Sequence, residues 1–200
     1  MIPINSIVPM AAEIMRNHGY YDGRKMFGIT GIDLLRTQCL YAMENRLNPR
    51  CCSVPVIGGH SSKTTIPLLS NATPLVQMDD KQAQEFTEKI RKGDDIVTRA
   101  KMGRSPTLSV AYSVLVFVRI ILHALDGNPT KVHAYVENND FGTSFFSGLV
   151  NITKDGTGDM QRYKHLSNYE CHLLEQSIAE LKKDVSRGTK ILEKGSLDVD

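Results

Sequence analysis

The sequence predicts an α+β fold in which a few mostly antiparallel strands pack against three long helices. The first observation is an apolar stripe at spacings of three and four from Leu108 to Leu125, the strongest helical signal in the chain. The second is a pair of β-rich runs, residues 131–137 and 144–153, joined by a polar turn region as in adjacent antiparallel strands. The third is a capping box at residues 167–170, which opens another amphipathic helix.

Size and composition allow one or two domains with a proper hydrophobic core. Of the 200 residues 41% are hydrophobic, and the net charge is +2 with both signs mixed along the chain. No basic stripe interleaved with aromatic residues occurs, so we expect no nucleic-acid partner. The most apolar run, residues 114–118, ends at Arg119 and is too short to cross a bilayer, so we expect no membrane association. The N-terminus resembles no targeting leader.

The four cysteines are expected to be free thiols in a reducing, intracellular compartment. They are Cys39, Cys51, Cys52 and Cys171. The middle two are adjacent, and a disulfide between neighbouring residues is strained and rare. No histidine partner lies at zinc-ligand spacing, so we expect no metal site.

The first part of the chain predicts helices on either side of a short strand. Residues 3–18 are expected to form a helix that ends at His18-Gly19. Residues 25–29 predict a strand, and a helix follows from Gly31 to about Arg46. Residues 61–70 are expected to form a loop and a short edge strand.

The second part predicts longer helices. Asp79-Asp80 is a natural helix start, and an apolar face carries that helix to about Lys101. Ser105 is a good N-cap for the next helix, with Pro106 at its first position. In the last helix we assign one apolar stripe to the core: Leu174, Ile178, Leu181, Val185 and Ile191.

Two stretches carry the candidate chemistry. In the first, a turn leads into an amphipathic run where Asp33 and Arg36 are three apart, so their side chains leave the same helical face. In the second, the β-branched run at 54–57 stops at Gly58-Gly59 and presents His60. A glycine pair lets the backbone turn sharply because no Cβ obstructs it.

A carboxylate, a guanidinium and an imidazole suit a reaction that deprotonates a hydroxyl beside a carboxylate. The imidazole of His60 exchanges protons near neutral pH, and Asp33 would fix its tautomer. Arg36 offers a two-pronged donor that matches a substrate carboxylate. Two simpler interpretations stay open: the Asp–Arg pair is a solvated surface pair, and His60 is structural.

Two blocks in register resemble a known family. Residues 30–37, TGIDLLRT, resemble the active-site helix of NAD-dependent malate dehydrogenases of the mitochondrial and bacterial type. Residues 54–61, VPVIGGHS, resemble the loop that carries that family's catalytic histidine. Further matches at 64–70 and 107–109 extend the resemblance over nearly the whole chain.

The resemblance implies roles for five residues. His60 would accept the hydroxyl proton, Asp33 would orient and stabilise it, and Arg36 would bind the substrate carboxylate. Ser105 would lie near the substrate, and Val110 stands where relatives carry a methionine against the nicotinamide of NAD.

The resemblance also implies a domain division. Residues 31–200 would form the C-terminal, substrate-binding domain of the lactate/malate dehydrogenase family, and residues 1–30 a remnant of the NAD-binding domain. The sequence contains no G-x-G-x-x-G motif, and Ile2 stands where the family has an asparagine that contacts nicotinamide and substrate. The family's substrate-binding lid arginines are absent too. A homodimer is expected by resemblance.

Three functions follow from these expectations. The first is NAD-dependent oxidation of malate to oxaloacetate. The second is a truncated, inactive relative that acts at most as a folding or dimerisation module, and the third is a dehydrogenase of another 2-hydroxy acid. Because the part that holds the cofactor is lacking, we expect very weak or no activity from the isolated chain and no saturable NADH binding.

Overall fold

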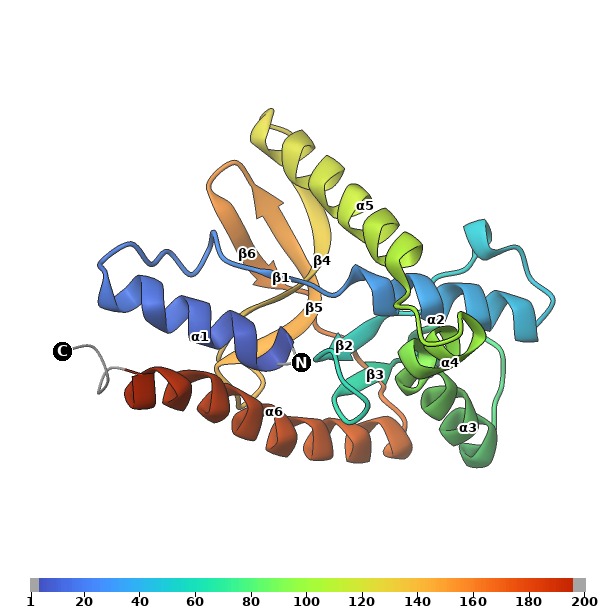
Figure 1. The fold of residues 1–200 in the computed structure, drawn as a ribbon. Coiled ribbons are helices and arrows are strands. Elements are labelled where there is room, and N and C mark those ends of the chain that lie inside the picture. Colours follow the sequence, from blue (N-terminus) through green and yellow to red (C-terminus); the bar gives the residue numbers. More distant parts are fainter. Residues whose placement is uncertain (1–3, 196–200) are drawn as a thin grey trace.

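A computed structural model describes residues 4–195, with side chains described through residue 190. Two helices, α1 (Ile4–Asn17) and α6 (Asn168–Gly195), lie side by side along one flank of a central sheet (Figure 1). Helix α5 (Thr107–Leu125) lies against another side of the sheet, and α2 (Gly31–Glu44) continues toward one end of the molecule. The predicted α+β class is confirmed.

The sheet is antiparallel throughout its described pairings. Its strands are β1 (Gly28–Ile29), β2 (Val56–Gly58), β3 (Thr65–Pro67), β4 (Thr130–Glu137), β5 (Phe145–Thr153) and β6 (Gly156–Met160). Their order is β1-β4-β5-β2-β3, with β6 also paired to β5. The predicted hairpin at 131–153 is confirmed as β4 and β5, and the predicted edge strand is β3. Strand β6 was not predicted, because its sequence GTGDM is poor in the β-branched and aromatic residues that favour strands.

Helices α1 and α6 approach each other closely. A Cβ on Gly188 of α6 would overlap the backbone oxygen of Ser6, so this crossing needs glycine. The predicted capping box opens α6: Ser167 donates its N–H to Glu170 Oε2 (2.8 Å), and Glu170 N–H binds Ser167 Oγ (3.2 Å). In the predicted stripe Leu181 is fully buried, and Leu174 and Val185 pack against the core. The side chain of Ile191 lies outside the described residues.

The helix predicted from Asp80 to about Lys101 is two helices, α3 (Asp80–Arg91) and α4 (Gly93–Ala100). The break lies at Lys92-Gly93, where a residue without Cβ lowers helix propensity. Asp94 and Asp95 then fall in the first turn of α4, where acidic side chains stabilise a helix start. The predicted N-terminus of α3 is confirmed, with Asp79 and Gln82 forming a capping box.

A second, smaller core lies between α2, α3 and the two 3-10 turns η1 (Pro49–Cys51) and η2 (Leu69–Asn71). Tyr41 and Phe86 meet edge to face there and are almost fully buried. This core fixes the position of α2 and of the polypeptide that leads into β2. All four cysteines lie in the described part of the chain and are unpaired thiols.

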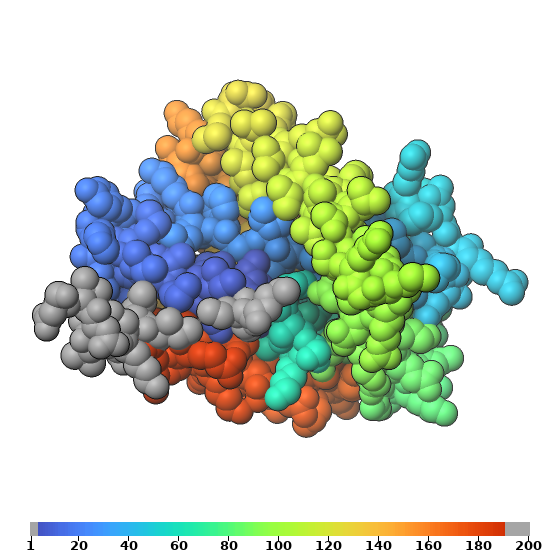
Figure 2. Space-filling model, in the orientation of Figure 1, coloured from blue at the N-terminus to red at the C-terminus, as the bar shows by residue number. Residues whose placement is uncertain are grey.

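Helix α5 confirms the predicted helix but shows its apolar stripe to solvent. The helix starts at Thr107 with Pro106 as N-cap, so Ser105 is not the cap. Leu108, Leu122 and Leu125 are each more than half exposed, whereas Phe117 and Ala124 are buried. Figure 2 shows α5 as a ridge across this face of the molecule. The apolar part of α5 is longer than the five-residue run 114–118, because the whole helix is long and apolar enough to span a membrane. The core helices of soluble proteins meet the same criterion.

Candidate active site

The loop after β2 presents His60, and its shape depends on two glycines. Gly58 has a φ of +101°, and a Cβ there would overlap the backbone oxygen of Thr64. A Cβ on Gly59 would lie 2.7 Å from Asn5 Oδ1 and 2.8 Å from the side chain of Leu181. The backbone therefore turns at the glycine pair as predicted, and the atoms that approach it closely belong to the protein itself.

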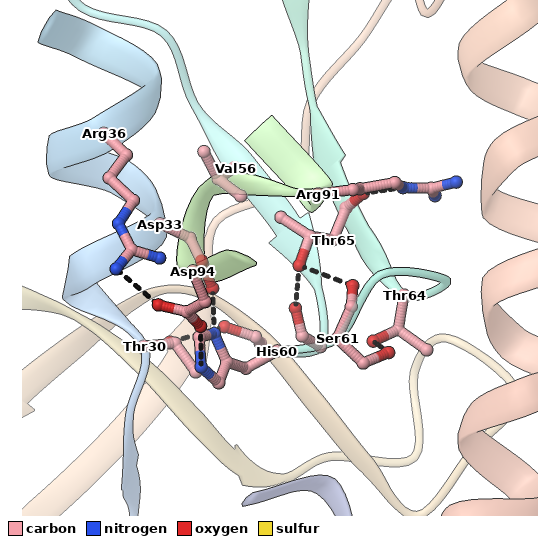
Figure 3. A network of polar contacts seen from close by, with 12 residues as sticks. Thr30, Asp33, Arg36, Val56, His60, Ser61, Thr64, Thr65, Arg91 and Asp94 are labelled. Carbon is pink, nitrogen blue, oxygen red and sulfur yellow. Dashed lines mark hydrogen bonds and ion pairs between the residues drawn. The ribbon is translucent and has the colours of Figure 1, made fainter. Parts of the chain in front are cut away.

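Asp33 and His60 come from different elements and meet at the centre of the site (Figure 3). Asp33 lies in the first turn of α2 and is 4% exposed, and its Oδ2 is 2.6 Å from His60 Nδ1. The hydrogen bond to Asp33 raises the pKa of His60 above 6.5, against the lowering that burial causes. Since a carboxylate accepts, Nδ1 of the neutral ring holds the proton and Nε2 keeps a free lone pair.

Arg36 lies one turn further along α2, on the same face as Asp33. Its guanidinium Nη2 is 2.5 Å from Oδ1 of Asp94, the second residue of α4. The other carboxylate oxygen of Asp94 is 3.9 Å from Nε2 of His60. The structure thus brings the three predicted residues together and adds a fourth, Asp94, which sequence reasoning did not identify.

These groups enclose a small cavity of about 70 Å³. Its lining residues are Asp33, Arg36, His60, Ser61, Ser62, Thr65, Ile90, Arg91 and Asp94. A larger, open depression of about 400 Å³ lies between residues 139–144 and α6. Lys182 is the one acidic or basic residue among those that line it, so this depression lacks the acid–imidazole pair that marks the smaller cavity.

A buried polar chain behind the site fixes the start of α2. His133 of β4 donates its Nε2–H to the carbonyl of Val56 (2.7 Å), so its Nδ1 accepts from the hydroxyl of Thr30 (3.0 Å). Ser147 of β5 completes the chain by donating to Thr30 Oγ1 over 2.7 Å. Burial lowers the pKa of His133, so this ring is neutral. His133 had no predicted role, and its only sequence signal is a polar ring inside a β-rich run.

Asn5 of α1 holds the backbone of the His60 loop. It is fully buried, and its Oδ1 accepts the N–H of His60 over 2.8 Å. Its Nδ2 donates to Thr64 Oγ1 (3.0 Å) and to Asp184 Oδ2 (3.1 Å). Sequence reasoning missed this role, although an amide in an otherwise apolar helical stretch was the available signal. Ile2, which the resemblance placed opposite a family asparagine, lies outside the described residues.

The structure does not bring Ser105 and Val110 into the cavity. Ser105 precedes α5 and is exposed, and its Oγ lies 3.1 Å from the hydroxyl of Thr107. Val110 lies in the first turn of α5 with 44% of its surface exposed. Their assignments to substrate and nicotinamide stay predictions.

Comparison with known proteins identifies relatives of the whole chain. It is 36% identical over 190 residues to mitochondrial malate dehydrogenase 2 of Arabidopsis thaliana, covering 94% of this chain and 56% of that protein. It is 35% identical over 191 residues to malate dehydrogenase of Haemophilus influenzae, covering 95% and 61%. The chain therefore spans little more than half the length of these relatives.

Solved structures show the same fold. Malate dehydrogenase of Cryptosporidium parvum superposes with a TM-score of 0.75 at 19% identity, over 90% of this chain and 60% of that one. Malate dehydrogenase of Plasmodium falciparum, solved in complex with NADH, gives 0.73 at 16% identity, over 92% and 64%. The family described as lactate/malate dehydrogenase, alpha/beta C-terminal domain, matches residues 30–192. This chain belongs to the lactate/malate dehydrogenase family.

Proposed function

We propose that this chain supplies the proton-transfer and carboxylate-binding groups of a malate dehydrogenase, which converts (S)-malate and NAD to oxaloacetate and NADH. The observation that carries this proposal is the hydrogen bond between Asp33 and His60, beside the guanidinium of Arg36. Family membership supports the reaction class, and the site supplies the groups that the substrate side of such a reaction needs.

His60 is the proposed proton acceptor. Because Nδ1–H is donated to Asp33, the Nε2 lone pair is free to accept the proton of the hydroxyl group on C2 of the substrate. The imidazolium that forms lies beside a buried carboxylate, which stabilises its charge. Acid–base help of this kind accelerates a reaction by roughly 10²- to 10⁴-fold.

Arg36 is the proposed carboxylate anchor. Its side chain is 15% exposed, and its planar guanidinium offers two donors that match a carboxylate. A carboxylate on Arg36 would place the neighbouring C2 hydroxyl toward His60, because both side chains line one cavity.

The chemistry of the described residues suits a carboxylate substrate and not the phosphates of NAD. A dinucleotide phosphate site needs a glycine-rich turn that leads into a helix N-terminus. The G-x-G pair of this chain, Gly156 and Gly158, lies in strand β6 instead. NAD, when bound, would supply the hydride acceptor, while His60 and Asp33 manage the proton and Arg36 holds the carboxylate.

Two other functions stay as alternatives. A truncated relative would fold or dimerise without turnover, and a dehydrogenase of another 2-hydroxy acid would use the same His60, Asp33 and Arg36. The expected homodimer and the reducing, intracellular location are part of the proposal. Relatives of this chain include mitochondrial, chloroplastic and bacterial malate dehydrogenases, so they favour no single compartment.

The test separates binding from turnover. Millimolar (S)-malate is titrated into the 200-residue protein while the ring protons of His60 are followed by NMR, with Arg36→Leu as the variant. We expect a saturable shift with (S)-malate that Arg36→Leu abolishes. Malate-dependent NADH formation is followed in parallel and is expected near background.

A malate shift that survives Arg36→Leu would contradict the proposed anchor. NADH formation well above background that His60→Asn abolishes would overturn the expectation of weak activity and confirm His60. If malate shifts no ring proton of His60 and sedimentation shows a dimer, the truncated relative that dimerises without turnover is favoured.

A further inference from the structure

Asp94 stands where a substrate carboxylate would stand. One of its oxygens pairs with Arg36 Nη2, and the other lies 3.9 Å from His60 Nε2 (Figure 3). It therefore spans the two groups to which the proposed function assigns the carboxylate and the hydroxyl of a 2-hydroxy acid. An Arg–carboxylate pair is a strong, charge-assisted contact, and Arg36 makes it with the protein's own side chain.

The space that remains is small for a ligand site, because the cavity of about 70 Å³ lies well below the roughly 300–1,000 Å³ of usual ligand pockets. Asp94 lines the cavity, so its departure would both enlarge the space and free Arg36.

Helix α4 lies outside the buried core. None of its eight residues is buried, and it is separated from α3 by the break at Lys92-Gly93. Among the described residues, the side-chain hydrogen bonds and ion pairs that join α4 to other elements all involve Asp94. Gly93 lies against the Arg36 side chain, where a Cβ would be 3.4 Å from Cδ.

We propose that Asp94 is a specificity-determining residue, an internal competitor that occupies the anion site at Arg36 until a small dicarboxylate or 2-hydroxy acid displaces it. This inference rests on the proposed function, because it concerns the same site. Displacement requires a ligand that gives Arg36 a carboxylate at least as well placed as Asp94. A ligand without a carboxylate would leave the ion pair between Asp94 and Arg36 in place.

A simpler interpretation is that the pair merely holds α4 in place. Surface ion pairs contribute little to stability, and the side chain of Asp94 is 51% exposed. That interpretation predicts no effect of Asp94 on ligand affinity. The two interpretations therefore differ in a measurable quantity, the dissociation constant of an anion at Arg36.

The experiment compares Asp94→Asn with Asp95→Asn in the full 200-residue chain. Asp95 is the exposed neighbour in the same helical turn, and its replacement changes the net charge equally. Binding of (S)-malate and of oxalate is measured by NMR on the His60 ring protons. We expect Asp94→Asn to tighten both ligands by about tenfold, which is 1.4 kcal/mol, and Asp95→Asn to change them less than twofold. Arg36→Leu in the Asp94→Asn background should remove the gain.

The outcomes distinguish this inference from the proposed function. Equal affinity of wild type and Asp94→Asn, with binding lost in Arg36→Leu, would overturn the competitor role and leave the proposed function intact. Tighter oxalate in Asp94→Asn without malate binding in any variant would support the competitor and overturn malate as substrate. No binding of either anion to any variant would overturn both.

A second variant distinguishes a failure of Asp94→Asn to fold from a true change in anion affinity. Asp94→Ser removes the carboxylate with a different neutral side chain, so the test stays available if Asp94→Asn does not fold. Serine should tighten anion binding as asparagine does. A folded Asp94→Ser protein with wild-type affinity overturns the proposal.

Discussion

Asn5 accepts the backbone N–H of His60 through its Oδ1 over 2.8 Å, so the first described helix holds the loop that carries the proposed base. The amide is fully buried and also donates to Thr64 and Asp184. One side chain therefore ties α1, α6 and the His60 loop together.

Replacing Asn5 by alanine should destabilise the protein by about 1–3 kcal/mol, because the partly buried N–H of His60 loses its acceptor. Urea unfolding measures the change, and the ring protons of His60 should move in the NMR spectrum. Asn17→Ala is the control at the exposed end of the same helix and should stay within about 0.5 kcal/mol. Equal stability of the two variants would contradict the role given to Asn5.

Replacing Asp33 by asparagine should lower the pKa of His60. The hydrogen bond to Asp33 is the largest cause of the raised value, and its loss leaves burial to favour the neutral ring. An NMR titration of the ring protons measures this shift. Asp155→Asn, in the exposed turn before β6, should leave the titration unchanged. An unaltered His60 titration in Asp33→Asn would show that the two groups do not interact in solution.

His60 and His133 should give the stability opposite dependences on pH. The folded pKa of His60 is raised above 6.5, so its contribution is full below pH 6.5 and is lost as pH rises through the folded pKa. The folded pKa of His133 is lowered by burial, so the unfolded chain binds the extra proton and stability falls as pH drops below 6.5.

Urea midpoints between about pH 5 and pH 9 test this pair of slopes. His60→Asn should flatten the decline on the alkaline side, and His133→Gln should flatten the decline on the acid side, although each variant also loses some overall stability. If His60→Asn instead flattens the acid decline in stability, or His133→Gln the alkaline one, the direction of the pKa shift assigned to that histidine is wrong.

Replacing Gly188 by alanine should destabilise the protein by about 1–3 kcal/mol, because the new methyl group would overlap the backbone oxygen of Ser6. The sign is informative, since alanine in place of glycine normally stabilises a helix interior by up to about 1 kcal/mol. Gly158→Ala is the control, because its Cβ would meet Asn151 at an ordinary 3.8 Å. Thermal unfolding of the two variants gives the comparison, and a more stable Gly188→Ala protein would contradict the close crossing.

The sequence was sufficient for the parts of the site that two local motifs encode. Asp33 and Arg36 share one helical face by spacing, and the glycine pair before His60 indicates a sharp turn, so their chemistry was predicted. Asn5, His133 and Asp94 were missed because their partners lie far away in sequence, 55, 103 and 58 positions respectively. A polar side chain shows no sign in the sequence of the distant donor or acceptor that it will meet.

The same limit applies to the elements. Periodicity predicted α5 correctly but did not say which face packs on the sheet, since its apolar residues surround most of the helix. Gly93 marks the break between α3 and α4 in the sequence. The apolar residues on both sides of it continue one helical face, so the sequence predicted a single helix. A Cβ on Gly93 would meet Arg36 at an ordinary 3.4 Å, so packing alone does not require glycine at that position.

The surface of α5 has a practical consequence for anyone who purifies this chain. The exposed leucines of α5 should make the protein bind strongly to a phenyl resin in hydrophobic-interaction chromatography, although its net charge is +2. Replacing Leu115 and Leu122 by lysine should shorten that retention while the circular dichroism spectrum stays unchanged. Handling conditions for the protein will therefore be set by a helix that does not line the cavity at His60.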